Sequence, residues 1–167
     1  LARAMIRSGA LDSGLFYIND AQQKANSQPK GDTLTEVFKA EIYSILGMAA
    51  YYKSDLQTAL QYSLDGANIL ETYGTKEQLI YVKINIAAVY AQLENPKKAI
   101  EYNLYAYREL KKLNITTHRS KIASNLATVY YDNRQNDSAL IWGRMAIELG
   151  KEFSYINSEI MGNYIVG

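Results

Sequence analysis

The stretch INIAAVYAQLENPKKAIEY, Ile84–Tyr102, predicts two helices that meet at a tight corner. At the corner, Asn95 is suited to cap the second helix and Pro96 to occupy its first position. Asn85 stands inside the first helical run, where asparagine is a poor helix former. This residue is therefore either a tolerated surface side chain or one that faces a ligand.

The same pattern occurs three times, at intervals of 40 residues. The residue that fixes the alignment is the alanine after each polar corner, and a small residue stands twelve positions before it and another seven after it. These columns are Ala59, Ala99 and Ala139; Gly47, Ala87 and Ala127; and Gly66, Ala106 and Ala146. One small residue on each helix lets two antiparallel helices approach closely. Because one such αα-hairpin cannot bury its apolar face alone, we expect the hairpins to stack into an all-α solenoid.

The composition limits the classes of function. The chain has 167 residues, of which 48% are hydrophobic and 21% are charged, as in a globular domain. A net charge of +1 gives no electrostatic bias toward nucleic acid or an anionic membrane, so we expect neither as a direct partner. The absence of cysteine excludes disulfides and thiol catalysis. No apolar run reaches the roughly 18 residues that could span a membrane.

The columns resemble those of the tetratricopeptide repeat family: a large and a small apolar residue, then a tyrosine, an alanine twelve past the small residue and a further small residue. The resemblance is strong over residues 41–148 and implies a right-handed superhelix in which the first helices of the repeats line a concave groove. The sequence departs from the family in its period of 40 rather than about 34. It also has Lys83 and Ala123 where an aromatic is usual, and Glu71, Lys111 and Lys151 where a proline is usual.

The alignment divides the chain 1–167 into a single array. We expect a partial repeat at 1–28, repeats at about 36–75, 76–115 and 116–155, and a partial repeat at 156–167. Leu1-Ala2, Gly9 and Gly14 fit the large-small pair, the corner and the anchor of the first of these. Since both ends cut through a repeat, we expect the chain to be an excised piece of a longer array.

The sequence predicts no catalytic, metal or cofactor site. His118 is the single histidine, and its place near a helix start favours a surface role. With one histidine and no cysteine, a histidine-rich metal site and a cysteine-histidine pair are excluded. Glycine-rich phosphate-binding motifs are absent, and the carboxylates are dispersed. We therefore expect that the protein is not an enzyme.

A surface stripe on the first helix of each repeat is the candidate binding site. On a helical wheel it lies away from the core stripe, at positions i, i+4, i+7 and i+11. By resemblance to the family it would line the concave groove. The groove candidates are Tyr52, Tyr81, Asn85, Gln92, Lys121, Asn125, Thr128 and Asp132.

Asparagines on stacked helices would lie about 10 Å apart, near the spacing of every third residue in an extended peptide. The alternative is that Asn85 and Asn125 are simply exposed. Only part of the lysine and asparagine pattern with which some family members hold a carboxylate is present.

These features favour a non-catalytic scaffold that binds a protein or peptide along the groove. The alternative is a sensor or regulatory segment of a larger bacterial regulator, with its output domain outside this segment. A third role is self-association through an uncapped hydrophobic end. The sequence does not determine the compartment: the lack of cysteine fits the cytoplasm, and it also fits a periplasmic region of a larger protein.

Overall fold

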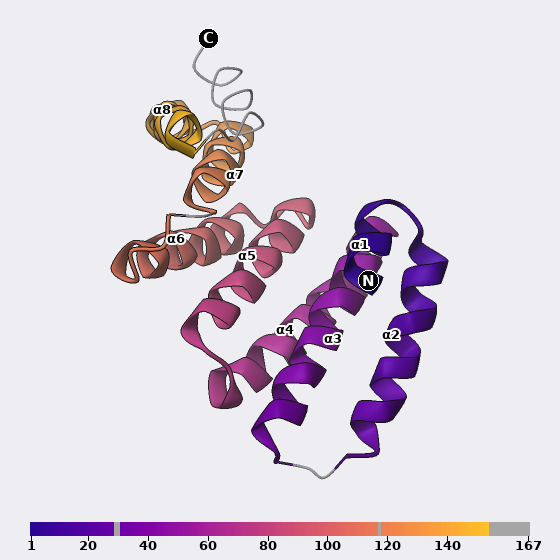
Figure 1. The fold of residues 1–167 in the computed structure, drawn as a ribbon. Coiled ribbons are helices and arrows are strands. Elements are labelled where there is room, and N and C mark those ends of the chain that lie inside the picture. The colour runs from indigo at the N-terminus through magenta and orange to yellow at the C-terminus, as the bar shows by residue number, and fades with distance from the viewer. Residues whose placement is uncertain (29–30, 117, 154–167) are drawn as a thin grey trace. The chain divides into compact units, whose positions relative to one another are not determined.

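The computed structural model describes residues 1–28, 31–116 and 118–153, and all regular structure in them is helical (Figure 1). The helices are α1 (Ala2–Arg7), α2 (Leu11–Asn26), α3 (Thr33–Tyr52), α4 (Leu56–Tyr73), α5 (Lys76–Gln92), α6 (Pro96–Lys112), α7 (Arg119–Asp132) and α8 (Asn136–Phe153). The expected all-α class is confirmed. The partial repeat expected at 156–167 lies outside the described residues.

The chain divides into two compact units, Leu1–Val89 and Tyr90–Gly167, and the boundary falls inside α5. In the first unit, α3 packs on α4, and α1 and α2 form a shorter pair beside α3. In the second unit, α7 packs on α8 and also contacts α6. The division does not follow the corners between helices, because α5 contributes residues to both units.

The corners between paired helices share one backbone geometry. Ser54, Glu94 and Arg134, spaced by 40 residues, all have the left-handed conformation, with φ of 61°, 53° and 56°. The amide after each of them donates to a carbonyl five residues back, over 2.9 to 3.0 Å. This hydrogen bond closes the end of the preceding helix in the manner of a Schellman motif. Gly9, with φ of 89°, occupies the same place between α1 and α2.

Side-chain caps fix where the next helix begins. Asp55 Oδ1 accepts from the amide of Thr58, and Asn95 Oδ1 accepts from the amide of Lys98, each at 3.2 Å. At the start of α5, Thr75 and Gln78 exchange side-chain and backbone hydrogen bonds as a capping box. These contacts satisfy amides that have no partner inside the helix.

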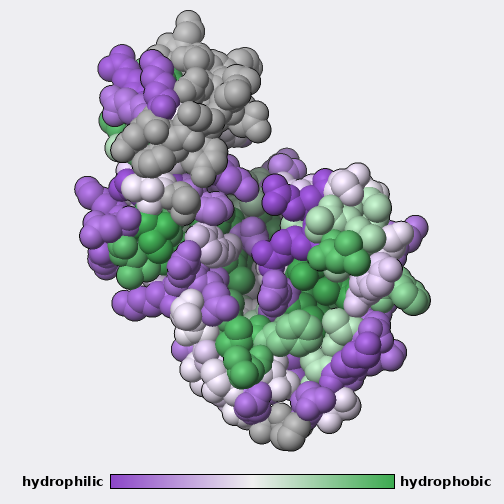
Figure 2. Space-filling view, in the orientation of Figure 1, coloured by the Kyte–Doolittle hydropathy of each residue, from purple (hydrophilic) through white to green (hydrophobic). Residues whose placement is uncertain are grey.

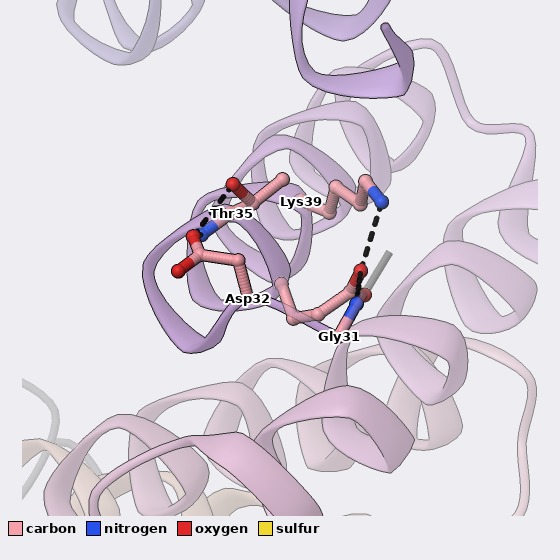
Figure 3. Close-up of polar contacts among 5 residues, drawn as sticks. Gly31, Asp32, Thr35 and Lys39 are labelled. Atoms are coloured by element: carbon pink, nitrogen blue, oxygen red, sulfur yellow. Dashed lines mark hydrogen bonds and ion pairs between the residues drawn. The ribbon is translucent and has the colours of Figure 1, made fainter. Parts of the chain in front are cut away.

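The start of α3 is the most elaborate of these caps (Figure 3). Asp32 Oδ2 accepts from both the amide and the hydroxyl of Thr35 at 2.8 Å. These two hydrogen bonds lower the pKa of the Asp32 carboxyl, since they favour its charged form. One turn on, Glu36 Oε1 accepts from Lys39 Nζ at 2.9 Å and from the amide of Gly31 at 3.5 Å. The ordered start of α3 therefore depends on these local side chains.

The core positions recur from helix to helix. In α4, α6 and α8, the residues at the anchor and at four, seven and eleven positions beyond it are all buried. These are Ala59, Ser63, Gly66 and Leu70; Ala99, Asn103, Ala106 and Leu110; and Ala139, Gly143, Ala146 and Gly150. Aromatic pairs flank this seam, with Tyr43 stacked on Tyr62 in the first unit and Tyr90 on Tyr102 in the second. The second helix of each hairpin therefore buries the same positions, although the residues at these positions differ.

Candidate peptide-binding surface

Asn85 is exposed on a helix that is otherwise almost entirely packed. The stretch of α5 from Leu79 to Ala91 has buried or half-buried residues at every position except this one. Its neighbours Ile84 and Ile86 are 4% and 0% exposed. Asn85 is therefore exposed on a helix whose neighbouring positions are buried or half-buried.

The other candidates of the first unit lie on α3 and α5. Tyr52, the last residue of α3, is 51% exposed, and its ring makes an edge contact with Tyr51. Tyr81 is half-buried, and its hydroxyl donates to Glu77 Oε1 at 2.8 Å. In α3, the position that corresponds to Asn85 holds Ile45, which is 7% exposed. The first unit thus offers two tyrosines and one asparagine to a ligand, but no asparagine on α3.

The second unit carries the remaining candidates on the end of α5 and on α7. Gln92, Lys121 and Asp132 are exposed, whereas Asn125 and Thr128 are half-buried. The Thr128 hydroxyl donates to the Ser124 carbonyl at 3.1 Å, so part of its hydrogen-bonding capacity is used within α7. Because Asn85 and Asn125 belong to different units, the expected 10 Å spacing between them stays a prediction.

The sequence did not predict one feature of this surface, an ion pair between α1 and α3. Arg3 Nη2 on α1 lies 3.3 Å from Glu41 Oε1 on α3, and both side chains are about half exposed. Glu41 belongs to the stripe that includes Tyr52, so the ion pair extends this surface onto α1. The corner alignment could have revealed Arg3, because Gly9 corresponds to Ser54 and Arg3 then corresponds to Met48.

Two departures from the repeat pattern compensate one another. Lys83 replaces the usual aromatic on α5, and Glu71 replaces the usual proline near the end of α4. The structure joins them, with Lys83 Nζ 3.2 Å from Glu71 Oε1. The Lys83 side chain is only 17% exposed, so this ion pair is shielded from solvent more than most surface pairs. This ion pair joins α5 to the helix before it, whereas the Tyr43–Tyr62 stack joins α3 to the helix after it.

The described part of the chain shows no arrangement typical of a catalytic or metal site. No three His, Asp or Glu side chains within it are placed to hold a metal ion. Burial raises the pKa of Tyr51 and of Tyr107, and the Glu101 carboxylate raises the pKa of Lys98. None of these groups belongs to the candidate surface. His118 is exposed at the start of α7, in the left-handed conformation with φ of 68°.

Two pockets among the described residues are lined by residues outside the candidate surface. One, of 400 Å³, is lined by the consecutive residues 134–138 of the last corner. Another, of 340 Å³, lies between the end of α2 and the start of α3, with Lys24, Leu34 and Phe38 in its lining. No helix among the described residues is long and apolar enough to cross a membrane.

The comparisons place the fold among known helical-repeat proteins. No family model matches the chain, and no curated protein matches it in sequence. Among solved structures, the apo form of RapI matches 98% of the chain with a TM-score of 0.82 at 16% identity. A signal-transduction ATPase with a tetratricopeptide repeat sensor, from Pyrococcus horikoshii, matches 97% with a TM-score of 0.76 at 20% identity. Tetratricopeptide-like repeats of a putative kinesin light chain from Podosopora anserina match 99% with a TM-score of 0.75 at 15% identity.

These likenesses concern the fold. The chain spans 60% of RapI, 25% of the ATPase and 80% of the kinesin light chain structure. The resemblance found in the sequence columns and the resemblance found in three dimensions rest on different observations, and they agree. The chain has a tetratricopeptide-like fold built from helix hairpins.

Proposed function

We propose that the protein is a non-catalytic scaffold that binds an extended peptide or protein segment along its first helices, α3, α5 and α7. The observation that carries this proposal is the exposure of Asn85 amid the packed positions of α5. A solvent-facing asparagine there contributes nothing to packing and lowers helix propensity. Its carboxamide can donate to and accept from the peptide groups of a bound chain, whatever side chains that chain carries.

The neighbouring side chains support the same role. Tyr52 and Tyr81 supply aromatic surface, and Lys121 and Asp132 supply one charge of each sign. Aromatic residues are enriched in protein interfaces, while isolated charges help to orient a partner. The tetratricopeptide-like fold is consistent with protein partners. We propose that Asn125 repeats on α7 the contact that Asn85 makes on α5.

The test begins with peptides selected from a display library on the purified chain. We expect the double variant Asn85→Ala with Asn125→Ala to bind the best such peptide about 1–3 kcal/mol more weakly, because two hydrogen-bonding groups are lost. Thermal stability should not fall, since alanine is the better helix former. Affinity is measured by isothermal calorimetry and stability by circular dichroism.

Asn68 provides a matched control. It is an exposed asparagine on α4, a second helix that the proposal leaves out of the binding surface. Asn68→Ala should leave peptide affinity unchanged. Unchanged affinity in the double variant together with lower stability would show that the two asparagines are structural and would overturn the proposal.

A second role, as the sensor or regulatory segment of a larger bacterial regulator, is favoured by one comparison. The Pyrococcus horikoshii ATPase is described as carrying a tetratricopeptide repeat sensor, and the chain matches a quarter of that protein. In this role the same surface would bind the signal, and an output domain would lie in the same polypeptide. The full-length gene sequence tests it: a DNA-binding, ATPase or kinase domain supports the regulator, and its absence supports a plain scaffold.

A further inference from the structure

The first helices of the repeats differ in the residues that fill their core positions. Two such positions in α5 hold Ile80 and Ile84, which are 1% and 4% exposed. Forty residues on, α7 has Ser120 and Ser124, which are 2% and 7% exposed. Because a buried isoleucine removes more apolar surface from water than a buried serine does, α7 gains less from its burial than α5.

The helix α3 has apolar residues that α7 lacks. It contains 20 residues, against 14 in α7. Its Tyr43 stacks on Tyr62, whereas α7 has Ala123 at the position of Tyr43. Hydrophobic residues also gather over α3, as over α1 and α2, on the face shown in Figure 2. The shortest of the three first helices, α7, thus has neither the isoleucines of α5 nor the tyrosine of α3 at these positions.

Two polar groups of α7 are buried without a hydrogen-bond partner among the described residues. They are the Ser124 hydroxyl and the Arg119 Nε. Such a group destabilises the folded state, because burial has removed its hydrogen bonds to water. Packing α7 against its neighbours therefore leaves hydrogen bonds unmade that water would form if the helix opened.

In the described chain, the start of α7 also lacks the side-chain cap that α3 and α5 have. Asp32 caps α3, and Thr75 caps α5 together with Gln78. At the N-cap of α7, His118 has φ of 68° and makes no side-chain cap hydrogen bond. A side-chain cap stabilises a helix, and positive φ costs a residue that has a Cβ. The cap, the core positions and the buried polar groups thus all weaken the same helix.

We propose that α7 is the adaptable helix of the binding surface. In the free protein it opens, by unfolding locally away from α6 and α8, far more often than the other first helices open. The α7 candidates Lys121, Asn125, Thr128 and Asp132 are in place for a peptide only when the helix is closed, so a bound peptide holds it closed. This inference rests on the proposed function and adds a regulation of the same surface.

Amide hydrogen exchange of the free chain, followed by NMR, tests the opening. The amides of Ile86 and Leu126 are matched: each follows an asparagine, and both side chains are 0% exposed. The protection factor of Leu126 should be at least about tenfold lower, because local opening controls exchange. Ala106 in α6 is the control within the second unit and should be protected as well as Ile86. Equal protection of Leu126 and Ile86 overturns the proposal. Equal protection of Leu126 and Ala106 also overturns it, because the second unit would then open as a whole.

A serine variant tests the cause of the opening. Ser124→Ala removes the buried hydroxyl and should slow exchange at Leu126 about fivefold. Ser44→Ala is the matched control, because it makes the same change at the corresponding, half-buried position of α3. It should slow exchange at Leu46 less and leave Leu126 unchanged. An unchanged Leu126 rate in Ser124→Ala overturns the proposal.

The peptide selected from the display library tests the coupling. At a free concentration of about 100 Kd it should slow exchange at Leu126 at least about tenfold, because opening of α7 then requires release of the peptide. An unchanged rate at Leu126 would show that the peptide binds without α7 and would overturn the proposal. Failure of the proposed function appears separately, as peptide affinity that the double asparagine variant leaves unchanged.

Discussion

The hairpins α3–α4 and α7–α8 fill the same site of close helix approach in two ways. In α3–α4, Gly47 on the first helix leaves room for Ser63 on the second, whose hydroxyl donates to the Ala59 carbonyl at 2.8 Å. A Cβ at Gly47 would lie 2.9 Å from Ser63 Oγ. In α7–α8 the first helix carries Ala127 and the second carries Gly143, both buried. In these two hairpins the smaller residue of the pair stands on opposite helices, on the first helix in α3–α4 and on the second in α7–α8.

The largest effect is expected from truncating the leucine beside this site. Leu46 and Leu126 occupy the same position in α3 and α7 and are 7% and 0% exposed. Changing either to alanine should lower the free energy of unfolding by about 2–5 kcal/mol, through lost burial and a residual cavity. Urea unfolding is followed by circular dichroism for the whole chain and by fluorescence of Trp142, the single tryptophan, for the second unit.

Because the chain forms two compact units, we expect the two leucine variants to affect these signals differently. Leu126→Ala should shift the Trp142 transition, and Leu46→Ala should shift mainly the dichroism. Equal shifts of both signals by both variants would instead mean that the chain unfolds as one cooperative unit.

A smaller effect is expected from exchanging the small residues themselves. Gly47→Ala should cost about 1–3 kcal/mol by overpacking against Ser63 and the Ala59 carbonyl. Made together with Ser63→Gly, which reproduces the size order of α7–α8, the same change should be tolerated. A double-mutant cycle by urea unfolding should then give a coupling energy of about 1 kcal/mol.

Gly66→Ala is the control for this cycle. Its Cβ would lie 3.2 Å from the Ala40 carbonyl oxygen and meet Tyr43 rather than Ser63. Its cost should therefore be the same with Ser63 or with glycine at that position. If Gly47→Ala likewise costs the same in both backgrounds, the two residues do not share a volume and the comparison of the hairpins is wrong.

The smallest effect is expected at the corners of the two hairpins. Ser54 and Arg134 both have positive φ, which costs a residue with a Cβ about 1–2 kcal/mol relative to glycine. Changing either to glycine should raise the free energy of unfolding by about 0.5–1 kcal/mol. This gain is smaller than the strain that is relieved, because glycine also raises the conformational entropy of the unfolded chain. Thermal unfolding measures the gain. Asn133→Gly, at a neighbouring residue with φ of −88°, should lower stability instead.

Much of the local structure was predictable because it depends on local chemistry. Asn95 and Pro96 start α6 as expected, and Asp55 caps α4. The left-handed corners were not predictable from composition, because Glu94 and Arg134 stand where glycine is usual. Their conformation is imposed by the hydrogen bonds that close the preceding helix. The ion pair between Lys83 and Glu71 could not be predicted either, because the spacing rules for side-chain pairs apply within one helix and these residues lie on two different helices.

The candidate surface was predictable only as a set of positions. The wheel places Ile45, Asn85 and Asn125 in one column, yet the first is buried, the second exposed and the third half-buried. Periodicity gives the direction in which a side chain leaves its helix, whereas exposure depends on what neighbouring helices bring to that side. Tyr52 and Lys121 are candidates for ligand contact because of their places on the helical wheel and their exposure.

The sequence by itself determined the helical class, the positions of the corners and the residues available to a core, because these follow from patterns within about 20 neighbouring residues. Tertiary structure decided which helix of a hairpin carries the smaller residue where the two helices pack closely. Gly47 is on the first helix of its hairpin, and Gly143 is on the second helix of its own. It also decided that Asn85 is open to solvent and that Lys83 has a carboxylate beside it. The physical reason is that packing depends on the summed volume and charge of side chains from separate helices, a quantity that no single helix encodes.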